Sequence, residues 1–95
     1  MKSGVNVKIK QGFSLKKENG EYAIICDKSI QKDFNSTIFL TGSSVFLWNM
    51  LASGEVNKEQ MLNALLENYN ISTVLALNNI DIFIKTLKEN GILEE

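Results

Sequence analysis

The sequence predicts an α+β domain in which a three-stranded antiparallel sheet is followed by three helices. Apolar and polar residues alternate along the first part of the chain, which is the pattern of strands with one wet face. The pair Asn19-Gly20 interrupts this alternation and is the strongest short signal for a hairpin. Apolar residues then recur at helical spacing between residues 42 and 90. With 95 residues, the chain is expected to form one domain, 1–95, around a single core.

The strands are expected within residues 5–40, with a break at Gln11-Gly12. A type I′ turn at the Asn-Gly pair places Leu15 opposite Ile24 and turns one face of both strands toward the core. The side chains expected on that face are Phe13, Leu15, Tyr22, Ile24 and Cys26. A polar stretch then leads to a third strand at about 36–40.

The three helices are expected at about residues 42–53, 57–69 and 72–90. Thr41 is the expected N-cap of the first helix, because its hydroxyl can accept a hydrogen bond from the first turn. Asn57 and Gln60 have the spacing of a capping box at the start of the second helix. Gly91 is expected to end the third helix in a Schellman motif, with Ile92 folding back onto the last turn.

The helix at 72–90 carries two apolar surfaces when its residues are placed at 100° intervals. The wider surface is expected to face the core and contains Ala76, Leu77, Ile80, Phe83, Ile84 and Leu87. A second stripe is formed by Leu75, Asn79, Ile82 and Thr86. Two interpretations of this stripe remain open: it packs beneath the sheet, or it forms one wall of a groove for a partner.

The helix at 42–53 contains Trp48, the only tryptophan, which is interpreted as a core anchor. Its expected inward face is Val45, Trp48, Leu51 and Ala52. Phe46 and Met50 point elsewhere, and either cover the second helix or form an exposed patch.

The composition argues against an enzyme or a metalloprotein. Histidine and arginine are absent, which removes the commonest general base, the commonest metal ligand and the bidentate phosphate donor. The glycines are scattered, so no phosphate-binding loop is expected, and no cofactor is predicted. The N-terminus lacks the apolar segment of a secretory signal, and no apolar run is long enough to cross a membrane. A cytoplasmic, non-catalytic protein is therefore expected.

Three helices with a preceding hairpin resemble a winged helix-turn-helix, so a DNA-binding transcriptional regulator is the alternative function. DNA binding needs basic side chains near the recognition helix. The third helix instead carries Lys85 and Lys88 beside Asp81 and Glu89, in a chain of net charge −1. Nucleic acid is therefore not an expected partner. A structural subunit of a larger enzyme is a further interpretation.

The order of core and cap residues carries a family resemblance. The relevant spacings are Ile38-x-Leu40-Thr41-x5-Leu47-Trp48-x2-Leu51-x2-Gly54, Leu62-x2-Leu65-x3-Tyr69 and Asp81-x-Phe83-x3-Leu87-x3-Gly91-Ile92-Leu93. Over residues 12–95 this pattern resembles the PqqD family, named for pyrroloquinoline quinone biosynthesis protein D. The same fold is also called the precursor-peptide recognition element of peptide modification systems.

The resemblance implies a winged-helix-like peptide chaperone with no catalytic activity of its own. Such a protein binds the leader of a ribosomally made precursor peptide and presents it to a radical S-adenosylmethionine enzyme. The leader is expected to add as a strand beside the third strand and to place side chains next to the third helix. By motif position, the peptide-binding residues are Ser36, Thr37, Ile38, Phe39, Leu40, Leu75, Asn79, Ile82 and Thr86. The same open edge could pair with a second copy, so a homodimer is also considered.

Overall fold

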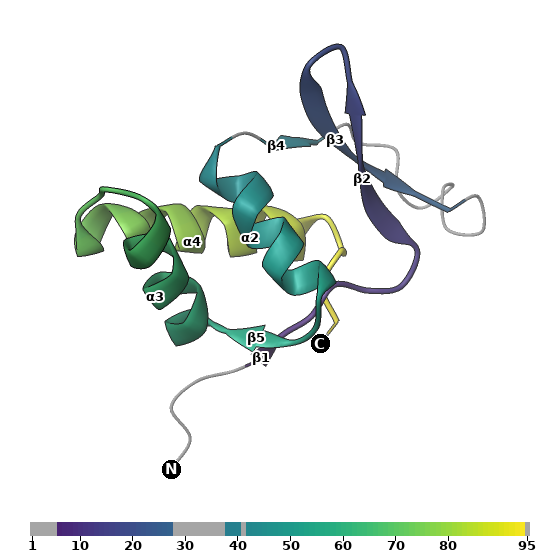
Figure 1. Cartoon of the computed structure of the whole chain (residues 1–95). Helices are drawn as coiled ribbons and strands as arrows, with labels where there is room; N and C mark the ends of the chain where they lie inside the picture. Colours follow the sequence, from purple (N-terminus) through teal and green to yellow (C-terminus); the bar gives the residue numbers. More distant parts are fainter. Residues whose placement is uncertain (1–5, 28–37, 41, 95) are drawn as a thin grey trace.

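The computed structural model describes residues 6–27, 38–40 and 42–94. Three helices pack together at one side of the molecule, and a β-hairpin extends from the other (Figure 1). The elements in chain order are β1 (Asn6–Val7), β2 (Phe13–Glu18), β3 (Glu21–Cys26), β4 (Phe39–Leu40), α2 (Ser43–Ala52), β5 (Val56–Asn57), α3 (Lys58–Asn68) and α4 (Thr73–Glu89). The α+β class, with a three-stranded antiparallel sheet and three helices, is confirmed.

The three-stranded sheet has the order β2-β3-β4, and both of its pairings are antiparallel. Leu15 lies opposite Ile24 in the β2–β3 hairpin, which is the register predicted from the turn. Asn19 and Gly20 both have positive φ angles, 54° and 81°, as a type I′ turn requires. The hairpin was therefore predictable from local turn chemistry alone.

The third strand was predicted at about 36–40, and within the described residues 38–40 it covers the last two positions. β4 contains Phe39 and Leu40, which lie opposite Ala23 and Tyr22 of β3. The N–H of Ile24 also donates to the C=O of Ile38 at 2.9 Å, so the ladder with β3 includes residue 38. The first two positions of the predicted strand, 36 and 37, lie outside the described residues.

A second, two-stranded sheet joins the N-terminal segment to the connection between α2 and α3, and it was not predicted. β1 pairs with β5, which connects α2 to α3. An isolated bridge then links Ile9 to Leu93, supported by the Lys10 N–H donating to the Ile92 C=O at 2.8 Å. Strands of two residues are too short to show a periodic pattern, so their pairing depends on tertiary contacts.

The start of α2 corrects one prediction. The helix begins at Ser43, and its N-cap position is Gly42, with φ 54° and no side-chain cap. The prediction that Thr41 is the N-cap is therefore wrong by one position, and Thr41 itself lies outside the described residues. A glycine with positive φ lets the chain turn directly from β4 into the helix, which a capped residue in the extended region would not do.

The other helix ends follow the sequence closely. The Asn57 side chain accepts from the Gln60 N–H at 2.8 Å, and the Gln60 side chain accepts from the Asn57 N–H at 2.9 Å. This is the predicted capping box. At the end of α4, Gly91 has φ 71° and the Ile92 N–H donates to the Leu87 C=O at 2.9 Å, which confirms the Schellman ending.

The core lies between the helices and the inner face of the sheet. Its buried apolar residues are Ile24, Leu40, Leu47, Trp48, Leu51, Met61, Leu65, Ala76, Ile80, Phe83, Leu87, Ile92 and Leu93. Trp48 is buried, as predicted. Ala52 is exposed, so its predicted place on the inward face of α2 is wrong, because the buried direction of that helix passes through Leu47. Phe46 packs edge-to-face on Tyr69, with ring centroids 5.6 Å apart, and therefore covers the end of α3.

Candidate functional site

The second stripe of α4 remains on the surface. Leu75 and Ile82 are 47% and 56% exposed, and Asn79 and Thr86 are half-buried. Only the wider face of the helix, which includes Ile80, is buried in the core. The interpretation that the stripe packs beneath the sheet is therefore wrong for its two aliphatic members. Two aliphatic side chains on one exposed stripe are available to a partner.

The stripe faces away from α3. An ion pair joins Lys58, the first residue of α3, to Asp81 of α4 and marks the side of α4 that α3 covers. At 100° per residue, Asp81 lies about 130° around the helix from the mean direction of the stripe. α3 therefore leaves the stripe uncovered.

β4 is one of the two edge strands of the three-stranded sheet, and β2 is the other. In an antiparallel ladder, successive residues direct their backbone groups to opposite sides of the strand. Because the Ile38 C=O accepts from β3, the N–H and C=O of Phe39 point to the side away from β3. In the strand order β2-β3-β4 that side has no neighbouring strand among the described residues. Phe39 thus carries one donor and one acceptor at an open edge.

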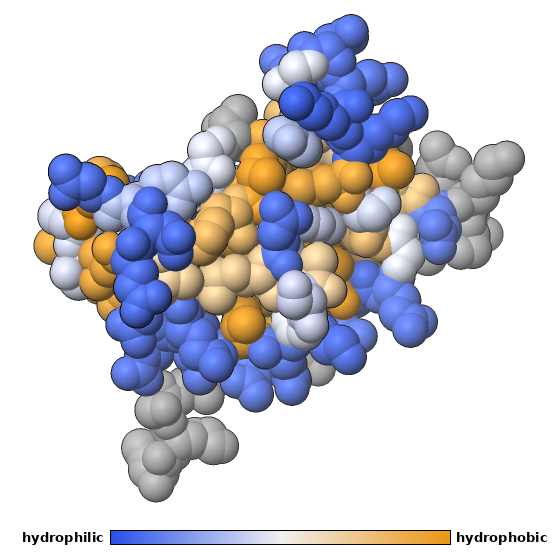
Figure 2. All heavy atoms as spheres, viewed as in Figure 1, coloured by the Kyte–Doolittle hydropathy of each residue, from blue (hydrophilic) through white to orange (hydrophobic). Residues whose placement is uncertain are grey.

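The two residues of β4 have opposite environments. The Leu40 side chain is buried in the core, whereas the Phe39 side chain is 55% exposed on the outer face of the sheet. Ala23 lies directly opposite Phe39, and Ile25, two residues further along β3, is 41% exposed on the same face. The surface of the hairpin tip is hydrophilic, and hydrophobic side chains gather below it (Figure 2). Ile25 and Phe39 therefore form an exposed apolar patch, here called the outer patch.

The outer patch of Ile25 and Phe39 was not predicted from the sequence as a contact surface, although a signal was present. The predicted register already placed Ile25 on the wet face of the hairpin. A large aliphatic residue on a wet face is unusual enough to mark a contact surface when an exposed aromatic lies beside it. The exposure of Phe39 depended on the β3–β4 register, which the sequence did not specify.

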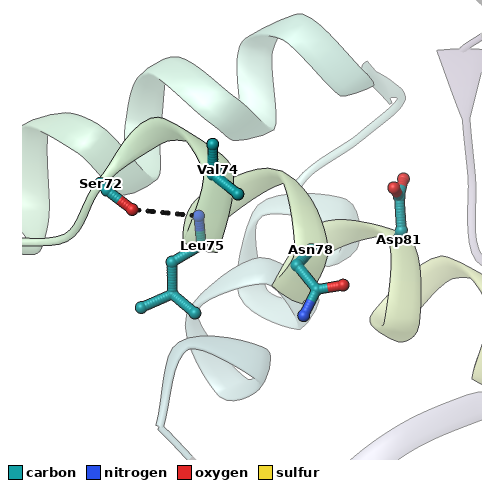
Figure 3. A pocket seen from close by; sticks show the side chains of 5 residues that line it. All are labelled: Ser72, Val74, Leu75, Asn78 and Asp81. Carbon is teal, nitrogen blue, oxygen red and sulfur yellow. Dashed lines mark hydrogen bonds between the residues drawn. The ribbon is translucent and has the colours of Figure 1, made fainter.

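Two open depressions lie on the described part of the chain, and the first of them shares Leu75 with the α4 stripe. The first is at the start of α4 and is lined by Ser72, Val74, Leu75, Asn78 and Asp81 (Figure 3). Val74 and Leu75 project to different sides of this turn, and the Ser72 hydroxyl accepts from the Leu75 N–H at 3.2 Å. The second lies between the segment 8–15 and the C-terminal half of α2. Of the predicted site residues that the structure describes, only Leu75 lines either depression.

The described part of the chain offers no cluster for metal chemistry. Within it, no group of three or more His, Cys, Asp or Glu side chains is arranged to hold a metal ion. Cys26 is a half-buried free thiol, in line with its position on the inner side of β3. No helix in the same part of the chain is both long and apolar enough to span a bilayer.

The family model described as "Coenzyme PQQ synthesis protein D (PqqD)" matches residues 31–93. The chain belongs to the PqqD family. This confirms the resemblance, although the match begins later than the expected residue 12 and leaves the β2–β3 hairpin outside it. No curated protein and no solved structure matches the chain. The PqqD match includes β4 and α4, the two elements that carry the open edge and the stripe.

Proposed function

We propose that this PqqD family member is a non-catalytic accessory protein that binds the leader segment of a precursor peptide. The observation that carries the proposal is the open edge of β4, where the backbone groups of Phe39 point away from β3. An open edge accepts an extended peptide through main-chain hydrogen bonds, and neighbouring side-chain surfaces then select its sequence. The proposed product pathway is that of pyrroloquinoline quinone or of a related modified peptide.

The α4 stripe supplies the second surface for the peptide. From Leu75 to Thr86 the helix advances about 16 Å, at 1.5 Å per residue. An extended strand of about five residues has the same length, at 3.3 Å per residue. Leu75 and Ile82 are about 10 Å apart along the helix axis, which is about three strand residues, so their exposed aliphatic side chains can both contact one short bound strand. Asn79 and Thr86 lie between and beyond them and can hydrogen-bond to the peptide.

The bound leader would be presented to a radical S-adenosylmethionine enzyme, which performs the chemistry. A binding role for this chain, with the chemistry left to the enzyme, agrees with the absence of histidine and arginine from the whole sequence. It also agrees with an interaction surface made of a backbone edge and aliphatic side chains. The DNA-binding alternative remains a prediction without a supporting observation, because the exposed charges of α4 at 81, 85, 88 and 89 are balanced.

The test is a titration of isotope-labelled protein with synthetic leader segments of short precursor peptides encoded beside its gene. We expect saturable shifts of the amides of Phe39 and Leu40 and of the α4 residues from Leu75 to Thr86. The amide of Gln60, in the first turn of α3, serves as an internal control and should not shift. Saturable binding without shifts at β4 and α4, or no binding of any leader, would refute the proposal.

A further inference from the structure

We infer that the peptide residue paired with Phe39 carries a large apolar side chain, which packs on the exposed Phe39 ring of the outer patch. The inference rests on the proposed function, because it assumes that a peptide strand adds to β4. It assigns to Phe39 a role in selecting the peptide, beyond the two backbone hydrogen bonds. The segment recognised would then be apolar on both faces of the added strand.

The register of β4 fixes which peptide residue meets the Phe39 side chain. The N–H and C=O of Phe39 point to the open edge, so an antiparallel peptide would form a hydrogen-bonded pair at this position. The two residues of such a pair have Cα atoms about 5.5 Å apart and side chains on the same face. The peptide side chain is therefore held against the Phe39 ring, on the face of the sheet that points away from the core.

The outer patch is left uncovered by its own sheet. On the β3 side, Phe39 is opposite Ala23, whose methyl group is too small to cover an aromatic ring. The next position across the sheet is Lys16, opposite Ala23, with a side chain that reaches Glu18. Phe39 consequently remains 55% exposed and Ile25 41% exposed. A large apolar side chain at the paired peptide position would cover the ring from its open side.

Contacts on both faces of the added strand restrict which peptide sequences can bind. Side chains alternate between the two faces of a strand, so the residues on either side of the paired one point to the inner face. On that side the proposed wall is the α4 stripe, with the aliphatic groups of Leu75 and Ile82. The recognised segment is therefore three consecutive apolar residues, rather than an alternating apolar and polar strand.

The test uses two fluorescein-labelled peptides that differ at one residue, with a central Leu-Ile-Leu or Leu-Ser-Leu. Each is titrated against the full chain and against Phe39→Ser, Phe39→Leu and Val74→Ser. Covering a phenylalanine that is 55% exposed corresponds to about a 4- to 15-fold gain in affinity. We expect the full chain to prefer Leu-Ile-Leu by this factor, and Phe39→Ser to remove the preference. Phe39→Leu should retain most of it, and Val74→Ser should retain all of it.

The outcomes separate this inference from the proposed function. Equal affinity of the full chain for both peptides, or an unchanged preference in Phe39→Ser, would overturn the inference and leave strand addition intact. If neither peptide shifts the amides of Phe39 and Ile82, strand addition fails and the inference fails with it. Thermal unfolding of Phe39→Ser, whose substituted side chain is largely exposed, shows whether the fold is retained.

Discussion

Ile80 and Ile82 lie two positions apart on α4. Substituting each in turn tests whether one face of the helix stabilises the fold and the other face binds the peptide. Ile80 is fully buried in the core, whereas Ile82 is 56% exposed on the stripe. Alanine at each position removes the same atoms from the same helix. The two substitutions should therefore separate stability from peptide binding.

The magnitudes follow from these two environments. Ile80→Ala should lower the free energy of unfolding by about 2–5 kcal/mol, the usual cost of truncating a fully buried isoleucine. That is a large fraction of the roughly 5–15 kcal/mol by which domains are stable. Ile82→Ala should change it by less than about 0.5 kcal/mol, as exposed substitutions do. Covering the exposed 56% of Ile82 is worth about 0.8–1.7 kcal/mol, so its loss should weaken leader binding about 4- to 18-fold.

Stability is measured by urea unfolding, followed through the fluorescence of Trp48, the only tryptophan and a buried one. Leader binding is measured by fluorescence anisotropy under conditions in which each variant is folded. Val74→Ala is the matched control, because Val74 is 78% exposed on the side of α4 away from the stripe. Destabilisation by Ile82→Ala as large as that by Ile80→Ala would show that the stripe is packed. Unchanged leader affinity in Ile82→Ala would refute its role as a binding wall.

Four further variants test the elements that position the site. Asn57→Ala breaks the capping box and should lower the melting temperature by about 4–8 °C, equivalent to about 1 kcal/mol, in differential scanning calorimetry. Gly91→Ala should destabilise by about 1–2 kcal/mol in urea unfolding, because φ is 71° and no atom lies within 4 Å to add a steric clash; Gly91→Asn should cost less. Asp81→Asn removes an ion pair between two largely exposed side chains and should change stability by less than about 0.5 kcal/mol, with a smaller difference in high salt. Deletion of residues 1–10 removes β1 and the Ile9–Leu93 bridge, and should lower the melting temperature by roughly 5–15 °C.

The features that sequence predicted correctly are those set by local backbone chemistry. The Asn19-Gly20 turn, the Asn57 capping box and the Gly91 ending each depend on a few neighbouring residues. Their hydrogen bonds and φ angles are available to the chain before any tertiary contact forms. The two faces of α4 were also predicted, because a helix of 17 residues gives its apolar period enough repeats to be read.

The features that sequence missed depend on contacts between distant segments. Pairing of β1 with β5, and of Ile9 with Leu93, joins residues that no local pattern relates. At the start of α2, Thr41 was a plausible cap by residue type, but the geometry of the corner places Gly42 there. In both cases the tertiary arrangement decides among local options of similar energy.

The candidate site was predictable in part for the same reason. The stripe of Leu75 and Ile82 followed from angular spacing, but its exposure required knowing that α3 covers another side of α4. The direction of the Phe39 backbone required the register of β4 against β3. The outer patch required both that register and the burial of Leu40.

The corner between β4 and α2 explains how so short a strand can hold its open edge in place. Alternation along the strand sends Leu40 into the core, among the side chains that include Leu47 and Trp48 of α2, and sends Phe39 outward. The same alternation directs the backbone of Ile38 to β3 and that of Phe39 to the open edge. Each anchored residue thus fixes the orientation of its neighbour. An edge that is already ordered loses little conformational entropy on binding. In the proposed complex, the free energy of two backbone hydrogen bonds and of one apolar contact would therefore be retained as affinity. The apolar character of this corner therefore mainly anchors the strand, and Phe39 is the residue of the corner that would contact a peptide in the proposed complex.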